Sequence, residues 1–506
     1  MSRRLILIFL LLVGTAVTSV AQQQTTPPTS GALLVWIGEG TAPENRIANS
    51  PSRVAALLPN GTLSTLIEFD SQTIGVQRCS SQPFSSDGRR FAFFASQPAA
   101  GADRGTLYQM TDLGAPATIG FTHTLTCALD NFGYSPDGAR LAYIDFLTFD
   151  DAAENVTGTL RVVNAETLAE EGRFERAVAF SLSNTELIFL QFFPNADNLV
   201  DEIAITAWDG VASREVSAIT ARAGCRFTGG NISPAQDGFI GVLVGEKCRS
   251  GDGRTRWQLY LIDRTARSST LLLSAPQEGG YFPASQTYNL YTSLDNTQAL
   301  FSFADGITRD SASIYRLDFQ APESALPVIE RAASMRRYVP LRLSLPAAAP
   351  AARSWDGRYW AVGVNPPGSA ELAVMDLGAI DSPIRIPVSR AGDAVRAMAF
   401  SPDSSALVYI AGGTGGGDTS LYHLDLALGV ESRIARGQYA PAIAVRGDKA
   451  AALIQYRSTN EATPRPYTDL VLVGPDGAQR DLLGGVVLDE QGFLKGFQFV
   501  VPLAWR

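Results

Sequence analysis

Residues 134–143 read Tyr-Ser-Pro-Asp-Gly-Ala-Arg-Leu-Ala-Tyr, and this combination of a tight turn and an apolar strand returns along the whole chain. Pro136 sets the backbone for the second position of a turn, Asp137 accepts local hydrogen bonds, and the glycine after it tolerates positive φ. The next residues place Leu141 and Tyr143 two positions apart. A period of two predicts a β-strand with a buried row of side chains.

This signature recurs eight times. The serine-equivalent positions are 85, 135, 181, 233, 293, 354, 401 and 446. Six copies align without gaps, the copy at 233 has two extra residues, and the copy at 446 is degenerate. The average spacing is about 52 residues, which is typical of a propeller or a similar repeat array.

A second apolar strand follows each signature and usually ends at Asp or Asn, as at 107–112, 259–263 and 421–425. A shorter apolar run often comes next, as at 271–274. Each unit thus offers four short antiparallel strands, which is the make-up of a propeller blade. We therefore predict an all-β fold, with a single β-propeller domain over residues 32–506.

The number of blades depends on the two ends of the chain. Strands expected at 33–37, 53–58 and 63–69 lack a fourth partner, which the C-terminal run from Phe493 could supply. A blade shared in this way closes the ring and covers an exposed edge. With this shared blade the count is nine blades, above the usual four to eight. We predict one ring of about eight four-stranded blades, within a range of seven to nine; two smaller propellers are the alternative.

The Ser-Pro-Asp-Gly turn, the apolar strand after it and the Leu-Tyr-x-Leu-Asp type of strand together resemble the TolB-type (WD40-like) β-propeller repeat. The resemblance covers residues 80 to about 485. It implies the propeller fold. For function it leaves several classes open, because the repeat occurs in partner-binding proteins, in accessory domains of peptidases and in enzymes.

The first residues predict export. Residues 2–4 are Ser-Arg-Arg, residues 5–20 are mainly apolar, and small residues precede Gln22, which is the pattern of a secretory signal peptide at 1–21. Residues 22–31 form a polar linker. An uncleaved membrane anchor is the alternative. We expect the mature protein in the periplasm, at the cell surface or outside the cell, with no membrane span after cleavage.

The cysteine content favours disulfides, because an even number of cysteines in an exported chain is typical of them. Cys225 and Cys248 lie symmetrically about a turn at 233–238, so a regular hairpin places them opposite one another. Cys79 and Cys127 each precede a signature and are candidates for a second bridge. Two free buried thiols are the alternative for this pair.

Charge and composition exclude some functions. With 41 Lys and Arg against 50 Asp and Glu, the net charge is −9, which disfavours nucleic acid as a partner. The chain has two His, so a His-rich metal site is excluded. We predict no cofactor and no metal, and we expect a monomer.

No residue set indicates catalysis. The signature aspartates sit at one repeated position, which favours turn formation, and the Gly-x-Ser-x-Gly motif of propeller-linked hydrolases is absent. We predict a non-catalytic scaffold that binds a protein, peptide or glycan; a secreted enzyme acting on glycans or peptides is the alternative. The loops between second and third strands are expected on one face, where binding is typical. This possible binding face includes Arg104, Arg249, Arg254, Arg256, Arg309 and Arg465.

Overall fold

The structure is a computed structural model of the 506-residue chain. The residues that it describes are 31–40, 51–69, 75–77, 83–85, 87–96, 104–123, 132–150, 155–195, 197, 199–232, 239–249, 255–274, 290–292, 298–303, 311–318, 321–333, 351–364, 371–379, 384–387, 393–413, 418–458, 466–488, 491 and 494–505. All regular structure in these ranges is β-strand.

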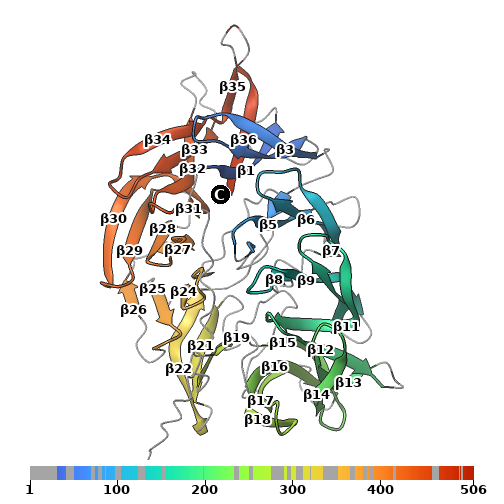
Figure 1. Ribbon diagram of the computed structural model, residues 1–506. Coiled ribbons are helices and arrows are strands. Elements are labelled where there is room, and N and C mark those ends of the chain that lie inside the picture. Colours follow the sequence, from blue (N-terminus) through green and yellow to red (C-terminus); the bar gives the residue numbers. More distant parts are fainter. Residues whose placement is uncertain are drawn as a thin grey trace, which may run out of the picture.

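Within the described ranges the strands form nine four-stranded antiparallel groups, which we call blades 1–9 and give from the innermost strand outward (Figure 1). Blade 1 contains β36 (Leu494–Trp505), β1 (Leu33–Gly40), β2 (Ser52–Leu57) and β3 (Leu63–Phe69), with β35 (Val486–Leu488) added beside β36. Blade 2 contains β4 (Gly75–Gln77), β5 (Arg90–Ser96), β6 (Arg104–Thr111) and β7 (Ala117–His123). Blade 3 contains β8 (Phe132–Tyr134), β9 (Arg140–Asp150), β10 (Asn155–Asn164) and the first half of β11 (Glu170–Leu182).

The second half of β11 begins blade 4, which continues with β12 (Leu187–Pro194), β13 (Val200–Trp208) and β14 (Ser213–Thr220). Blade 5 contains β15 (Cys225–Ile232), β16 (Phe239–Cys248), β17 (Thr255–Asp263) and β18 (Ser268–Ser274). Blade 6 contains β19 (Leu290–Thr292), β20 (Gln298–Phe303), β21 (Ser311–Asp318) and β22 (Ala321–Ala333).

Blade 7 contains β23 (Ala351–Arg353), β24 (Tyr359–Val364), β25 (Glu371–Asp376) and β26 (Ile384–Pro387). Blade 8 contains β27 (Asp393–Phe400), β28 (Ala406–Gly413), β29 (Thr419–Asp425) and β30 (Val430–Gly437). Blade 9 contains β31 (Tyr439–Val445), β32 (Ala451–Ser458), β33 (Pro466–Val473) and β34 (Gln479–Leu483).

The two ends of the chain close the ring in blade 1. β1 and β36 pair antiparallel from Leu33 opposite Trp505 to Gly40 opposite Phe497, and Figure 1 shows the blue and red strands side by side. The indole N–H of Trp505 donates to the carbonyl of Ala444 in blade 9 (3.0 Å). The shared blade therefore takes strands from both ends of the chain, as the sequence indicated.

In the blades whose side-chain burial is described, the second strand is more buried than its sequence alternation predicts. Phe91 and Phe93 of β5 are fully buried, as expected, but the intervening Ala92 and the following Phe94 are fully buried too. These side chains pack in two different clusters, one shared with blade 1 and the other with blade 3. Since each blade is covered by a neighbour on both sides, both rows of this strand belong to the core.

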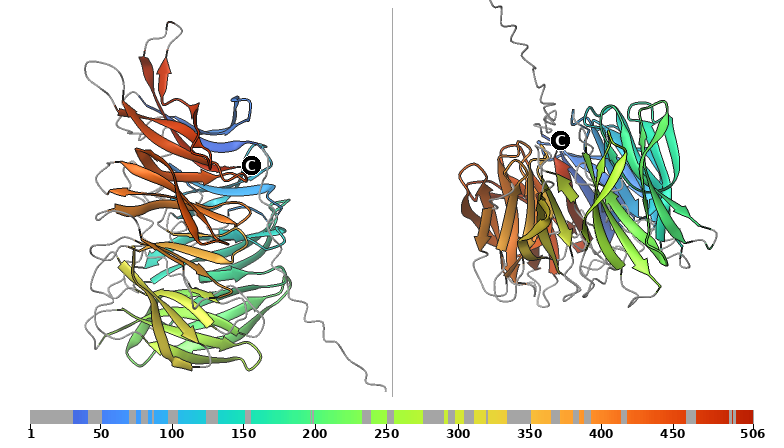
Figure 2. Two further views of the ribbon diagram at one scale, coloured as in Figure 1. Left: turned by 90° about the vertical axis from the view of Figure 1, so that its left-hand side faces the viewer. Right: turned by 90° about the horizontal axis from the view of Figure 1, so that it is seen from below.

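The strands run between two faces of the ring, as Figure 2 shows from two sides. The signature turns, which join first to second strands, lie on one face, here called the turn face. The connections between second and third strands lie on the opposite face, here called the loop face. In the described part of the chain, no helix is long and apolar enough to cross a membrane.

Candidate functional site

The signature turns hold their own aspartates. In blade 2 the hydroxyl of Ser85 donates to the carboxylate of Asp87 (2.5 Å) and accepts the amide N–H of Arg90 (2.9 Å). The Asp87 carboxylate also accepts the amide N–H of Arg89 (3.0 Å). The same arrangement surrounds Asp137, Asp356 and Asp403. These aspartates act as turn formers, as the sequence indicates.

Hydrogen bonding favours the ionised form of the Asp87 and Asp403 carboxylates. Burial acts to raise the pKa of Asp87, but the bonds from Ser85 and the Arg89 amide, with the charges of Arg90 and Arg89, bring its pKa below the ordinary value. The pKa of Asp403 is lowered in the same way, by bonds from Ser401 and Ser405 and by the charge of Lys449, against the effect of burial. A carboxyl with a lowered pKa is a poor general acid near neutral pH.

Turns of neighbouring blades also bind each other. The amide N–H of Asp137 in blade 3 donates to the side-chain oxygen of Asn184 in blade 4 (2.7 Å), and that of Asp356 in blade 7 donates to the hydroxyl of Ser404 in blade 8 (3.1 Å). Asn184 and Ser404 both occupy the position that is Gly in the regular signature. At these copies the departure from Gly therefore provides an acceptor that joins two blades.

An aromatic contact crosses the middle of the ring at the turn face. Phe84 precedes the signature of blade 2, and Trp355 is the second residue of the signature of blade 7. Their ring centroids lie 5.2 Å apart, although blades 2 and 7 are not neighbours. Trp355 also packs against the apolar cluster that blades 1, 2 and 9 share. Apolar side chains of blades on opposite sides of the ring therefore meet at this face.

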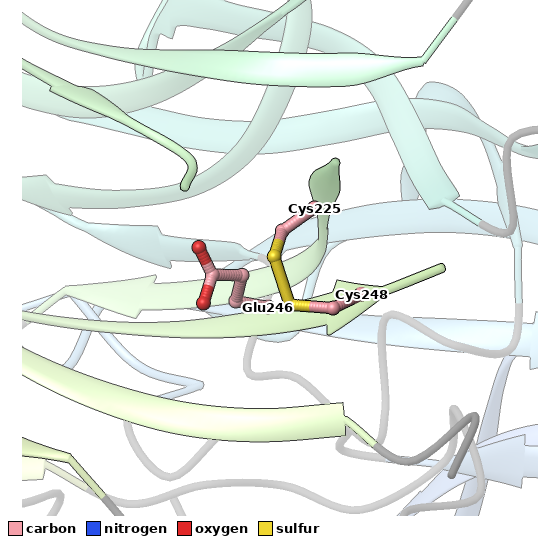
Figure 3. Close-up of side chains that lie close together, drawn as sticks. All are labelled: Cys225, Glu246 and Cys248. Carbon is pink, nitrogen blue, oxygen red and sulfur yellow. A yellow bond between two sulfur atoms is a disulfide. The ribbon is translucent and has the colours of Figure 1, made fainter. Parts of the chain in front are cut away.

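The disulfide predicted between Cys225 and Cys248 is present in blade 5. The two residues are directly opposite in the register of β15 and β16, at the loop face, as the hairpin symmetry indicated. Figure 3 shows their sulfur atoms beside the carboxylate of Glu246. Cys79 and Cys127 lie outside the described residues.

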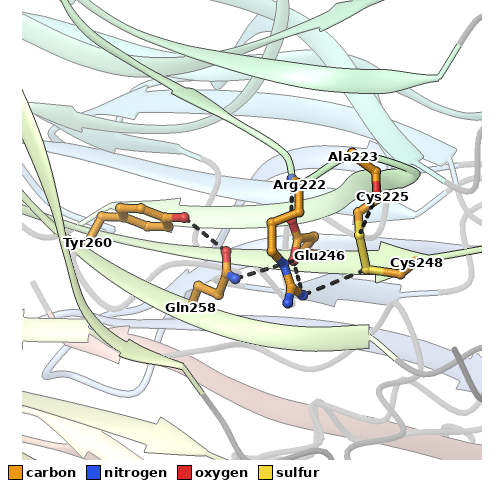
Figure 4. Close-up of a disulfide and its surroundings, with 7 residues drawn as sticks. All are labelled: Arg222, Ala223, Cys225, Glu246, Cys248, Gln258 and Tyr260. Atoms are coloured by element: carbon orange, nitrogen blue, oxygen red, sulfur yellow. Dashed lines mark hydrogen bonds and ion pairs between the residues drawn. A yellow bond between two sulfur atoms is a disulfide. The ribbon is translucent and has the colours of Figure 1, made fainter. Parts of the chain in front are cut away.

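Glu246 is a buried charge, 1 % exposed, near the end of β16. Its carboxylate accepts the amide N–H of Arg222 (2.8 Å) and the Nε–H of the same residue (2.7 Å). The side-chain amide of Gln258 donates to it as well (3.2 Å), and the hydroxyl of Tyr260 donates to Gln258 (3.0 Å; Figure 4). A buried carboxylate needs such partners, because an unpaired charge in this position is costly.

The charges of this cluster reinforce each other. The hydrogen bond to Glu246 raises the pKa of Arg222 above its ordinary value, although burial acts against it. The pKa of Tyr260 is raised mainly by burial and then by the charge of Glu246, with Arg222 acting in the opposite direction. Arg222 therefore stays cationic and Tyr260 stays neutral near neutral pH.

The cluster fixes the connection between blades 4 and 5. Arg222 lies in the segment between β14 and β15, whereas Glu246 lies on β16, so the ion pair ties this connection to blade 5. The disulfide joins β15 to β16 within blade 5, directly after the connection. In the described residues, Cys225, Glu246 and Cys248 form a group whose ligand atoms lie within 4.8 Å of one another. The sulfurs are bonded to each other and the carboxylate to Arg222, so the oxidised cluster is structural and offers no vacant metal ligands.

Sequence reasoning missed Arg222 and Glu246. A usable signal was present, because Glu246 ends the apolar run 239–245 and lies two residues before Cys248, on the same face of the strand. A single acid at the end of a buried strand indicates a cationic partner. The identity of that partner depends on the connection from blade 4, which a strand pattern does not show.

The arginines of the possible binding face are only partly placed. Arg249 follows β16 and is exposed. Arg104 begins β6, and Arg256 is the second residue of β17, where only the backbone is described. Arg254, Arg309 and Arg465 lie outside the described residues. Topology places Arg104, Arg249 and Arg256 on or beside connections at the loop face.

Comparison with known proteins finds limited structural similarity to several solved structures. Neither a family model nor a curated protein matches the chain. The crystal structure of a eukaryotic initiation factor has a TM-score of 0.47 at 12 % identity, covering 94 % of this chain and 99 % of that chain. A prolyl endopeptidase has a TM-score of 0.40 at 13 % identity, covering 77 % of this chain and 53 % of that chain. The β-propeller domain of the Trilobed protease from Pyrococcus furiosus has a TM-score of 0.34 at 12 % identity, covering 69 % of this chain and 95 % of that chain.

Proposed function

We propose that this protein is an exported, non-catalytic β-propeller of the TolB-like type, which binds a protein, peptide or glycan in the cell envelope or outside the cell. The observation that supports it most is the contact between Phe84 and Trp355, which joins apolar side chains of blades on opposite sides of the ring at the turn face. A ring enzyme needs convergent polar groups at the axis. The carboxylates near these two residues in the sequence, Asp87 and Asp356, are bound within their own turns.

Export is supported by the signal pattern of residues 1–21 and by the disulfide, since disulfides persist in oxidising compartments. The loop face is the proposed binding surface. It lies opposite the turn face, and Arg104, Arg249 and Arg256 lie on or beside its connections, in a chain whose net charge is −9. Arginine pairs with carboxylates in a bidentate geometry, so an anionic partner fits this face.

The proposal is tested by charge reversal. The mature chain, the variant Arg254→Glu with Arg256→Glu, and a control variant Arg433→Glu are immobilised, and partner retention from the envelope fraction is quantified. Arg433 is exposed on β30, an outer strand, away from the loop face. We expect the double variant to lose a specific partner about tenfold or more, and the control to retain it. Equal retention by all three proteins contradicts the binding face.

The alternative, an enzyme acting on glycans or peptides, has a separate test. The wild-type chain is incubated with panels of neutral and acidic oligosaccharides and of peptides, and the products are measured by mass spectrometry. Turnover that follows the purified protein, and that is lost when a loop-face carboxylate is changed, would replace the binding proposal with an enzymatic one.

A further inference from the structure

The two sulfur atoms of the disulfide have unlike surroundings. The guanidinium of Arg222 donates an N–H to Sγ of Cys248 at 3.6 Å, whereas Sγ of Cys225 lies 3.9 Å from the main-chain carbonyl oxygen of Ala223 (Figure 4). A cationic donor stabilises negative charge on sulfur, and a carbonyl oxygen favours a protonated thiol instead. Both cysteines are partly exposed at the loop face.

We propose that Cys225 is a site for thiol–disulfide exchange with a low-molecular-weight thiol, and that Cys248 is the leaving thiolate. The incoming thiolate attacks Sγ of Cys225, an S–S bond forms between them, and the Cys225–Cys248 bond breaks. The electron pair of the broken bond stays on Sγ of Cys248, beside Arg222. Attack of the Cys248 thiolate on Sγ of Cys225 reverses the exchange and releases the small thiolate. Attack of a second small thiolate on the small-thiol sulfur of the mixed disulfide completes it, releasing the oxidised small thiol and the Cys225 thiolate, so the small thiol is the only reductant needed. Exchange is faster when the leaving thiol is the more acidic of the two.

The other charge in the cluster does not remove this asymmetry. A carboxylate oxygen of Glu246 lies within 4.8 Å of both sulfur atoms, so its charge acts on both cysteines. It is also bound by Arg222 and Gln258. The hydrogen bond from Arg222 reaches only Cys248 among the described contacts, and it therefore sets the direction of exchange.

Exchange at this site leaves the blade in place. After the disulfide opens, Arg222 still binds Glu246, and the amide N–H of Ala221 still donates to the carbonyl of Asp201 (2.8 Å). The amide N–H of Arg249 also donates to the carbonyl of Gly224 (3.0 Å). The connection between blades 4 and 5 thus keeps three anchors, so the adduct can form on folded protein.

The first experiment maps the adduct on the folded wild-type chain. The protein is incubated with a limiting amount of glutathione at neutral pH, quenched with acid, and alkylated with N-ethylmaleimide before peptide mapping. We expect the glutathione adduct on Cys225 and the alkyl group on Cys248, with a preference of about fivefold or more. Equal adducts on both cysteines, a preference for Cys248, or no adduct on either would overturn the proposal.

The second experiment changes the group that sets the direction. Arg222→Gln removes the cation but keeps a hydrogen-bond donor, and Arg433→Gln is the matched control, since Arg433 is exposed on β30 in blade 8, away from the disulfide. We expect Arg222→Gln to slow adduct formation roughly three- to tenfold and to reduce the preference for Cys225, with Arg433→Gln unchanged. Arg222→Lys should restore part of the rate. If both Gln variants exchange at the wild-type rate and position, Arg222 has no such role.

Discussion

His423 lies on β29 with its Nε2 atom buried and without a hydrogen-bond partner in the described part of the chain. Burial lowers its pKa below the ordinary 6.5, and the nearby charge of Lys449 lowers it further, while Asp425 acts in the opposite direction. The folded state therefore disfavours the imidazolium. The unfolded chain binds this proton more readily than the folded protein does. The folded protein is therefore most stable above the ordinary pKa, where His423 is neutral in both states, and it loses stability as the pH falls below that value.

We therefore predict that the stability of the wild-type protein falls as the pH drops below about 6.5. The substitution His423→Gln should flatten the dependence in this window, because Gln does not titrate. The measurement is the free energy of unfolding by urea at several pH values. The turn aspartates with lowered pKa values, such as Asp87, act in a separate window below their ordinary value of 3.8. An identical slope in both proteins would rule out His423 as the source.

Two hairpins at the turn face have the same local backbone conformation, but one has Arg267 and the other Gly429 at the position with positive φ. The carboxylates of Asp263 and Asp425 each accept amide N–H groups two and three residues later. The fourth residue after each aspartate has positive φ, 52° at Arg267 and 64° at Gly429. A side chain at positive φ is strained, whereas Gly adopts this conformation freely.

We predict that Gly429→Ala destabilises the protein by about 1 kcal/mol or more, because a methyl group at φ 64° is strained although no atom lies within 4 Å of it. The reverse change, Arg267→Gly, should be neutral or stabilise by up to about 1 kcal/mol. Arg267 is exposed, so little contact area is lost. Thermal unfolding of both variants measures the effects. A loss on Arg267→Gly equal to that on Gly429→Ala would mean that strain is not the cause.

At the scale of the element, the signature serine links a turn to the strand that follows it. Ser401 is fully buried, donates to Asp403 (2.5 Å) and accepts the amide N–H of Ala406 (3.0 Å), so it joins the end of β27 to the start of β28. Ser405 also donates to Asp403 (2.8 Å), but it is less buried and lies at the outer side of the turn.

We predict that Ser401→Ala lowers the free energy of unfolding by about 2 kcal/mol, because a buried amide N–H and a carboxylate both lose a partner. The matched control Ser405→Ala should cost less than about 1 kcal/mol, since water can replace its hydroxyl. Urea unfolding of both variants tests this difference. Equal losses in the free energy of unfolding for both variants would show that the buried position of Ser401 contributes no extra stability.

At the scale of the whole molecule, the contact between Phe84 and Trp355 joins opposite sides of a large ring. We predict that Trp355→Ala destabilises the protein by about 2–4 kcal/mol, because it removes an aromatic ring from a shared apolar cluster. Trp355→Phe should cost less than about 1.5 kcal/mol, since a smaller ring still fills part of the site. The free energy of unfolding is the measurement.

Val211→Ala provides the control for this effect. Val211 is 92 % exposed on the hairpin of blade 4, so its removal should change stability by less than about 0.5 kcal/mol. If Trp355→Ala changes the free energy of unfolding as little as Val211→Ala does, the contact between Phe84 and Trp355 contributes nothing to the stability of the ring.

The sequence by itself determined the repeated unit: the Ser-x-Asp turn, the strands on either side of it, and the pairing of Cys225 with Cys248, because these features depend on residues close together in one hairpin. It also indicated the closing blade. Only the tertiary structure decided that both rows of Phe91–Phe94 are buried, that Trp355 meets Phe84, and that Glu246 binds Arg222. These contacts join blades or their connections, and their geometry depends on how many blades share one axis, which no local pattern specifies.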